Sequence, residues 1–79
     1  MLIITFEEIT QINAKLSTIG FPCKVAVYDR PEGQECHLIF PPDASFDQLI
    51  RATNEVENYF RMRGKPVRFS GNGKRFYLV

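Results

Sequence analysis

Residues 60–79 read Phe60-Arg-Met-Arg-Gly-Lys-Pro-Val-Arg-Phe-Ser-Gly-Asn-Gly-Lys-Arg-Phe-Tyr-Leu-Val79. This stretch holds six of the ten lysines and arginines of the 79-residue chain and none of its nine acids. Asn72-Gly73 lies between two segments of strand-forming residues, a pattern typical of a hairpin closed by a primed two-residue turn. The stretch therefore predicts a basic, aromatic β-hairpin.

The register of this hairpin follows from the position of the turn. It places Phe69 opposite Phe76 and Val67 opposite Leu78, so the apolar side chains share one face of the hairpin. The other face then carries polar and aromatic side chains, namely Arg68, Ser70, Arg75 and Tyr77.

The composition bounds the class of protein. Hydrophobic residues make up 44% and charged residues 24% of the chain, values typical of a soluble globular domain and unlike those of disordered, fibrous or membrane proteins. We expect one domain, residues 1–79, without an export signal or membrane span, because the wholly apolar runs reach only three or four residues. Two cysteines without metal-ligand spacing, Cys23 and Cys36, favour reduced thiols and a cytoplasmic location.

Charge is distributed unevenly along the chain. Residues 1–59 hold nine acids against four bases, a net charge of −5, whereas residues 60–79 carry +6, which together give the overall +1. Such asymmetry indicates either an anionic partner or complementary charges within the fold.

Two helices are predicted from capping patterns. Thr5 and Ser45 each precede an apolar-periodic segment and have Glu8 or Gln48 three residues later, as in a capping box. The first helix is expected to end near Ile19 and the second before Gly64. The predicted inward positions are Phe6, Ile9, Ile12, Leu16 and Ile19 in the first helix, and Phe46, Leu49, Ile50, Val56, Tyr59 and Phe60 in the second. The helix acids are expected on solvated faces: Glu7, Glu8, Glu55 and Glu57, the last paired with Arg61.

Another hairpin is predicted from residues 23–29 and 35–40, which are rich in strand formers and flank a turn at 30–33. Placing Tyr28 opposite Glu35 puts six residues on the core face: Cys23, Val25, Val27, Cys36, Leu38 and Phe40. The opposite face then shows Lys24, Ala26, Tyr28, Glu35, His37 and Ile39.

These elements predict an α+β two-layer sandwich, in which an antiparallel sheet carries both helices on one face. Residues 1–40 and 41–79 read as repeats, because Thr5-Phe-Glu-Glu-Ile9 resembles Ser45-Phe-Asp-Gln-Leu49 and Gly20-Phe-Pro resembles Gly64-Lys-Pro. The order is αββαββ, a duplicated αββ unit. If Met1–Ile4 adds a strand, the order contains a ferredoxin-like unit with an extra strand.

Candidate binding residues gather on the predicted uncovered sheet face and the closing hairpin. Cations beside aromatic rings suit single-stranded nucleic acid, because bases stack on the rings and phosphates meet the cations. The predicted macromolecule-binding residues are Lys24, Tyr28, Lys65, Arg68, Lys74, Arg75 and Tyr77.

Catalysis is not expected. Cys36 and His37 are adjacent on a strand and point to opposite faces, so they cannot share a proton, and no cofactor or metal motif occurs. We expect a small non-enzymatic binding or regulatory protein that uses its open sheet face and closing hairpin, with single-stranded nucleic acid as one candidate partner. The alternative is a protein-binding adaptor or inhibitor of the kind encoded by mobile elements, acting through the same face or as a homodimer.

Overall fold

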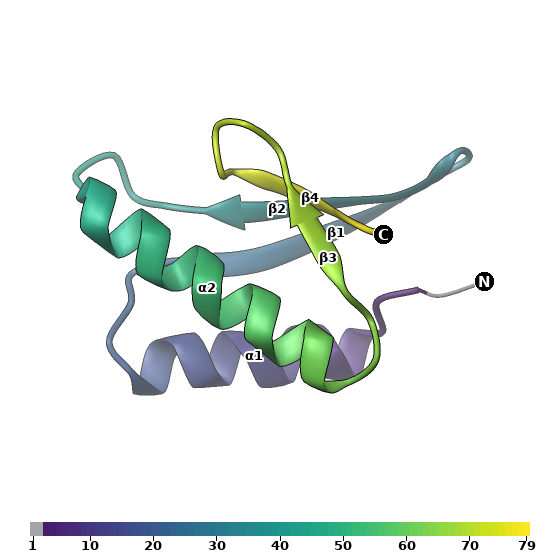
Figure 1. The fold of residues 1–79 in the computed structure, drawn as a ribbon, viewed down its shortest axis with the longest axis horizontal. Coiled ribbons are helices and arrows are strands. Elements are labelled where there is room, and N and C mark those ends of the chain that lie inside the picture. Colours follow the sequence, from purple (N-terminus) through teal and green to yellow (C-terminus); the bar gives the residue numbers. More distant parts are fainter. Residues whose placement is uncertain (1–2) are drawn as a thin grey trace.

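The computed structural model describes residues 3–79, which form two helices and an antiparallel four-stranded sheet (Figure 1). In chain order the elements are α1 (Phe6–Thr18), β1 (Lys24–Arg30), β2 (Gly33–Ile39), α2 (Phe46–Met62), β3 (Val67–Phe69) and β4 (Arg75–Leu78). Both helices lie on the same side of the sheet (Figure 1). The predicted α+β sandwich is therefore confirmed.

Both helix starts are confirmed as capping boxes. The Thr5 hydroxyl accepts a hydrogen bond from the Glu8 amide at 3.2 Å, and the Glu8 carboxylate accepts one from the Thr5 amide at 2.8 Å. Ser45 and Gln48 repeat this exchange at 3.1 and 3.0 Å. Each box satisfies backbone N–H groups that have no partner inside the helix, which is why the two helices begin where they do.

The registers of both hairpins are confirmed, but the turn of the second is not the predicted one. Val67 pairs with Leu78 and Phe69 with Phe76. A primed Asn-Gly turn requires positive φ at both residues, whereas only Gly73 has it, at 71°. The Asn72 side chain instead accepts hydrogen bonds from the Ser70 hydroxyl and the Lys74 backbone amide. A five-residue loop, 70–74, joins the strands and is closed by a hydrogen bond from the Ser70 amide to the Arg75 carbonyl.

The sheet has the order β1-β2-β4-β3, so the two hairpins meet at their second strands. β2 pairs with β4 through Cys36–Phe76 and His37–Arg75. This arrangement accords with two αββ units side by side, although an origin by duplication stays a prediction. The ferredoxin-like alternative is not supported by the described residues, because Ile3 and Ile4 form no strand and β4 lies beside β2. Met1 and Leu2 lie outside the described residues.

The core lies between the sheet and the helices. Its fully buried apolar side chains are Ile4, Ile12, Leu16, Val25, Cys36, Leu38, Ala52, Val56, Phe60 and Phe76. Cys23 and Phe40, predicted to oppose each other, fall just outside the paired strands but still pack half-buried against the core.

The inward stripe of each helix differs from the predicted one. Phe6 and Phe46, both the first residue of a helix, are 83% and 77% exposed, and Ile19 and Ile50 are also exposed. The buried side chains of α1 are spaced four residues apart, at Glu8, Ile12 and Leu16. Phe6 precedes Glu8 by two residues, about 200° around the helix, and therefore points away from the core.

Candidate binding face

The side of the sheet without helices carries the alternate side chains of every strand. We call it the open face, formed by Lys24, Ala26, Tyr28, Arg30, Glu35, His37, Ile39, Arg68, Arg75 and Tyr77. Strand alternation places these residues opposite the buried ones, as predicted. Ala26, His37 and Arg75 form one row across three strands.

Two aromatic rings of the open face are accessible to solvent. Tyr28 on β1 is 46% exposed and Tyr77 on β4 is 51% exposed. Arg68 lies opposite Tyr77 on the neighbouring strand, and the Arg30 guanidinium lies 5.9 Å from the centre of the Tyr28 ring. The edge of the sheet and its middle therefore each present a ring beside a cation.

Glu35 organises the charges between these rings. Its carboxylate contacts the imidazole of His37 at 2.7 Å, the guanidinium of Arg75 at 3.3 Å and that of Arg30 at 3.5 Å. The hydrogen bond with His37 is the main cause that lowers the pKa of Glu35, with burial opposing it and the two arginines adding to it. Sequence analysis placed Glu35 on this face but missed this role, which its position two residues from His37 on one strand indicates.

The predicted cations of the open face differ in whether they are paired with an acid. Arg75 is paired with Glu35, as described above. Within residues 3–79, Lys24, Arg68 and Lys74 are exposed and make no ion pair. Lys74 lies in the loop between β3 and β4, directly before the strand that carries Arg75 and Tyr77.

Lys65 does not join the open face. Its side chain is only 18% exposed, and its ammonium donates to the Glu8 carboxylate at 2.7 Å and to the Ile3 carbonyl at 2.8 Å. It thus lies on the helix side of the sheet, where a buried acid holds it. We therefore leave Lys65 out of the candidate binding residues.

Glu8, the acid that binds Lys65, is buried and not solvated as predicted. Glu8, predicted to lie on a solvated face, is 1% exposed, and its second oxygen accepts from the Arg63 guanidinium at 2.8 Å. Burial alone would raise the pKa of Glu8, but the hydrogen bonds from Lys65, Thr5 and Arg63 outweigh it and lower the pKa to about 2. Two of the six basic residues of the closing stretch are thus explained by the fold itself. The signal for this burial was the spacing of four from Glu8 to Ile12.

The outer helix surfaces carry most of the remaining paired charges. Lys15 pairs with Glu55 across the two helices at 3.5 Å, and Arg51 lies 3.9 Å from Asp47 on α2. The predicted pair of Glu57 and Arg61 is replaced by a hydrogen bond from Arg61 to Asn58. Five of the nine acids lie on the helices, namely Glu7, Glu8, Asp47, Glu55 and Glu57, whereas Glu35 is the acid of the open face.

Neither cysteine is a strong nucleophile at neutral pH. Burial raises the pKa of Cys23, and it raises that of Cys36 to about 11. A thiol reacts as its thiolate, so both groups are largely unreactive. Among residues 3–79, no cluster of three or more His, Cys, Asp or Glu side chains is close enough to bind a metal ion.

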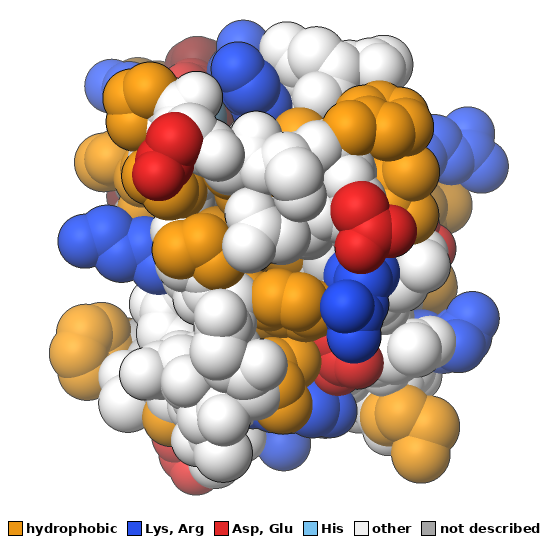
Figure 2. Space-filling view, turned by 90° about the vertical axis from the view of Figure 1, so that its left-hand side faces the viewer, with side chains coloured by type: hydrophobic (Ala, Val, Ile, Leu, Met, Phe, Trp, Pro, Cys, Tyr) orange, Lys and Arg blue, Asp and Glu red, His pale blue; other side chains and the backbone are white. Residues whose placement is uncertain are grey.

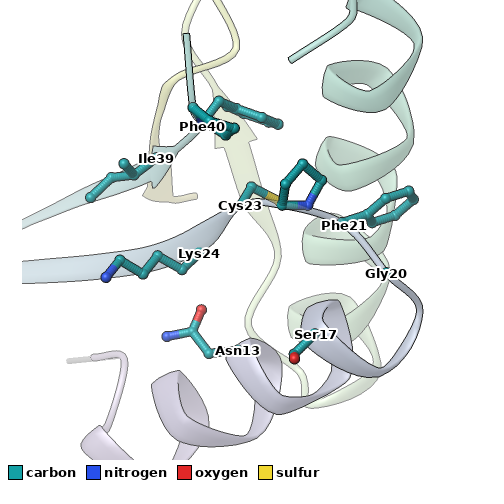
Figure 3. Close-up of a pocket in the computed structure, with 10 residues that line it drawn as sticks. Asn13, Ser17, Gly20, Phe21, Cys23, Lys24, Ile39 and Phe40 are labelled. Atoms are coloured by element: carbon teal, nitrogen blue, oxygen red, sulfur yellow. The ribbon is translucent and has the colours of Figure 1, made fainter. Parts of the chain in front are cut away.

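A hollow of about 700 Å³ adjoins one end of the open face, between the end of α1, the start of β1 and the end of β2 (Figure 3). Its lining is mostly apolar and includes Phe21, Ile39 and Phe40, with the Lys24 side chain running along its rim (Figure 3). Hydrophobic side chains are exposed in several groups on this end of the molecule, among charged side chains, other side chains and backbone (Figure 2). The hollow continues the open face, because Lys24 and Ile39 belong to both.

The chain matches no protein-family model, no curated protein and no solved structure. Within residues 3–79, neither helix combines the length and the apolar character needed to cross a membrane.

Proposed function

We propose that this protein is a non-enzymatic binding protein that holds single-stranded nucleic acid on its open face. One observation carries the proposal: a sheet face without helices presents two exposed tyrosines and, around them, three cations that form no ion pair with any residue of 3–79. These cations are Lys24, Arg68 and Lys74. The unreactive thiols accord with the absence of a covalent step, and we place the protein in a reducing compartment such as the cytoplasm.

The geometry suits stacked bases and their phosphates. Tyr28 and Tyr77 are on strands separated by β2, so their backbones are about 10 Å apart at the usual strand spacing. Each ring therefore serves a different base, and base stacking on an aromatic ring is worth about 1–3 kcal/mol. Arg68, opposite Tyr77, lies where the phosphate of a base stacked on that ring would pass.

Glu35 limits how strongly the open face can bind phosphates. Its carboxylate neutralises part of the charge of Arg30 and Arg75, which leaves three free cations for phosphates. Each phosphate neutralised on a single strand contributes about 0.7 to the slope of log affinity against log salt, so we expect a slope of about −2.

The test is fluorescence anisotropy with labelled single-stranded RNA and DNA over a range of salt concentrations. A triple variant, Lys24→Ser, Arg68→Ser and Lys74→Ser, should lose binding and most of the salt dependence. A matched variant, Lys15→Ser, Arg51→Ser and Arg61→Ser, removes the same charge from the helices and should bind like the wild type.

Two results would contradict the proposal. Equal loss in both variants would show that only net charge matters, and unchanged binding in the first would exclude the open face. If neither nucleic acid binds, an affinity pull-down that retains a protein on the wild type but not on a Tyr28→Ser, Tyr77→Ser variant would identify a protein partner instead. Tyrosine is enriched at protein interfaces too.

A further inference from the structure

β1 forms one edge of the sheet, and its outer edge is only partly protected. At Val25 the backbone N–H donates to the side-chain oxygen of Asn13 at 2.6 Å, and the Val25 carbonyl accepts from the Asn13 amide nitrogen at 3.0 Å. Asn13, on α1, thus occupies both outward groups of this residue. A second strand cannot pair at Val25 without displacing the Asn13 side chain.

Two residues further along, the edge is free. Backbone groups alternate along a strand, so the N–H and carbonyl of Val27 and Asp29 point outward as those of Val25 do. β1 pairs with β2 on its other side, and within residues 3–79 these four outward groups have no hydrogen-bond partner. A seven-residue edge strand with unpaired groups is a template for another strand.

Helix geometry directs an exposed aromatic side chain of α1, Phe6, towards this free edge. Phe6 precedes Asn13 by seven residues, about two turns of α1, so both side chains leave the helix on the same side. Those seven residues span about 10 Å of helix, or about three residues of the antiparallel β1, which places Phe6 level with Tyr28. Phe6 is exposed to solvent, and this helical geometry directs its side chain towards the free part of the β1 edge.

We propose that a second copy of this chain pairs with β1, strand to strand and antiparallel, in one register. In that register Val27 of each copy lies opposite Asp29 of the other, and the two pairs exchange four backbone hydrogen bonds. Tyr28 faces Tyr28 of the second copy at the two-fold axis, and both Phe6 side chains lie beneath this axis and cover each other. Such a contact is isologous and closes at two copies.

Neighbouring registers form fewer bonds. Pairing Val27 with its own copy requires Val25 opposite Asp29, and Asn13 already occupies the Val25 groups. Pairing Asp29 with its own copy brings Val27 opposite Pro31, which has no N–H to donate. The proposed register also brings Lys24 level with Glu32 of the second copy, so opposite charges meet at each end.

The interface joins the sheets at their edges and lays no chain over the open face, although Tyr28 and Lys24 of that face lie beside the seam. Two sheets joined at β1 would form one sheet of eight strands, and their open faces would be continuous across the axis. The inference does not depend on the proposed nucleic-acid binding, because it rests on the backbone groups of the β1 edge, on Phe6 and on the match of Lys24 with Glu32, whatever the open face binds.

Sedimentation of the full chain between about 1 μM and about 1 mM tests the proposal. The wild type should shift from monomer to dimer within this range. Asp29→Pro removes only an outward N–H and leaves the β1–β2 hydrogen bonds in place, so this variant should fold and stay monomeric. Its control, Asp29→Ala, keeps the N–H and should dimerise.

Phe6→Ala should weaken the dimer about tenfold or more, whereas Phe46→Ala, the same position in α2, should leave it unchanged. A wild type that stays monomeric to about 1 mM, or a folded Asp29→Pro variant that dimerises normally, would overturn the proposal.

Amide exchange in the wild type gives an independent readout if the proline variant does not fold. Exchange at Val27 and Asp29 should slow as the protein concentration rises, while Val25, bonded to Asn13, should be protected at every concentration. Concentration-independent exchange at all three amides would also overturn the proposal.

Discussion

The pH dependence of stability should be dominated by the buried carboxylate of Glu8. Its pKa is lowered from the ordinary 4.5 to about 2 in the folded protein, a difference of about 2.5 pH units. At about 1.4 kcal/mol per pKa unit, this corresponds to about 3 kcal/mol of stability. A folded domain is commonly stable by only about 5–15 kcal/mol, so the loss should be measurable.

The sign follows from the direction of the shift. A group whose pKa is lower when folded binds fewer protons in the folded state, so its contribution is complete above pH 4.5 and declines as the pH falls towards 2. Urea denaturation at pH 6, 4, 3 and 2 should therefore show a progressive fall in the free energy of unfolding.

A single variant isolates this contribution. Glu8→Gln keeps the shape of the side chain but removes its charge, so it should be less stable by about 3 kcal/mol at pH 6 and nearly as stable as the wild type at pH 2. Glu7→Gln changes the exposed neighbour in the same helical turn and should follow the wild-type curve. If the wild type and Glu8→Gln lose stability in parallel between pH 6 and 2, the Glu8 cluster is not the source of the dependence and this reasoning fails.

Three further predictions test the caps, the sidedness of β4 and the charge of the open face. Thr5→Ala and Ser45→Ala should each cost about 1 kcal/mol in chemical denaturation, with Thr5→Ala the larger because its hydroxyl also bonds Glu8; no effect at either site would contradict the caps. Phe76→Ala should cost about 3–5 kcal/mol, whereas replacing its exposed neighbour by Tyr77→Ala should stay within about 0.5 kcal/mol, and equal costs would refute the alternation. Glu35→Gln should strengthen binding of single-stranded RNA and steepen its salt dependence, because it frees Arg30 and Arg75; weaker binding would show that the carboxylate itself contacts the partner.

The fold could be predicted because its signals are local. The capping boxes at Thr5 and Ser45 depend on residues three apart, and the strand registers depend on alternation within each hairpin. Both patterns depend on residues that are close in sequence, so they can be recognised without knowing how distant parts of the chain pack. The order of strands, by contrast, depends on how β2 meets β4, and no residue pattern within either hairpin determines that.

The errors concern positions whose environment is tertiary. Phe6 and Phe46 are apolar, but each is the first residue of its helix and is exposed. In α1 the side chains that face the core lie at every fourth residue, starting at Glu8. A glutamate at one of these positions could be buried only because Lys65 and Arg63, more than fifty residues away, reach it. Likewise Glu35 was placed on the open face, but its contact with Arg75 follows from the β2–β4 pairing.

The two halves share one plan but protect their sheet edges differently. In the first half, α1 supplies Asn13 to the outer edge of β1. In the second, the residue at the matching offset of 40 is Thr53, whose hydroxyl bonds the Leu49 carbonyl within its own helix. The outer strand there, β3, has only three residues, and short edge strands resist pairing without further protection. The longer β1 needs protection and, from the residues that the structure describes, receives it at Val25 alone, which is why we propose a second copy of the chain at this edge and not at β3.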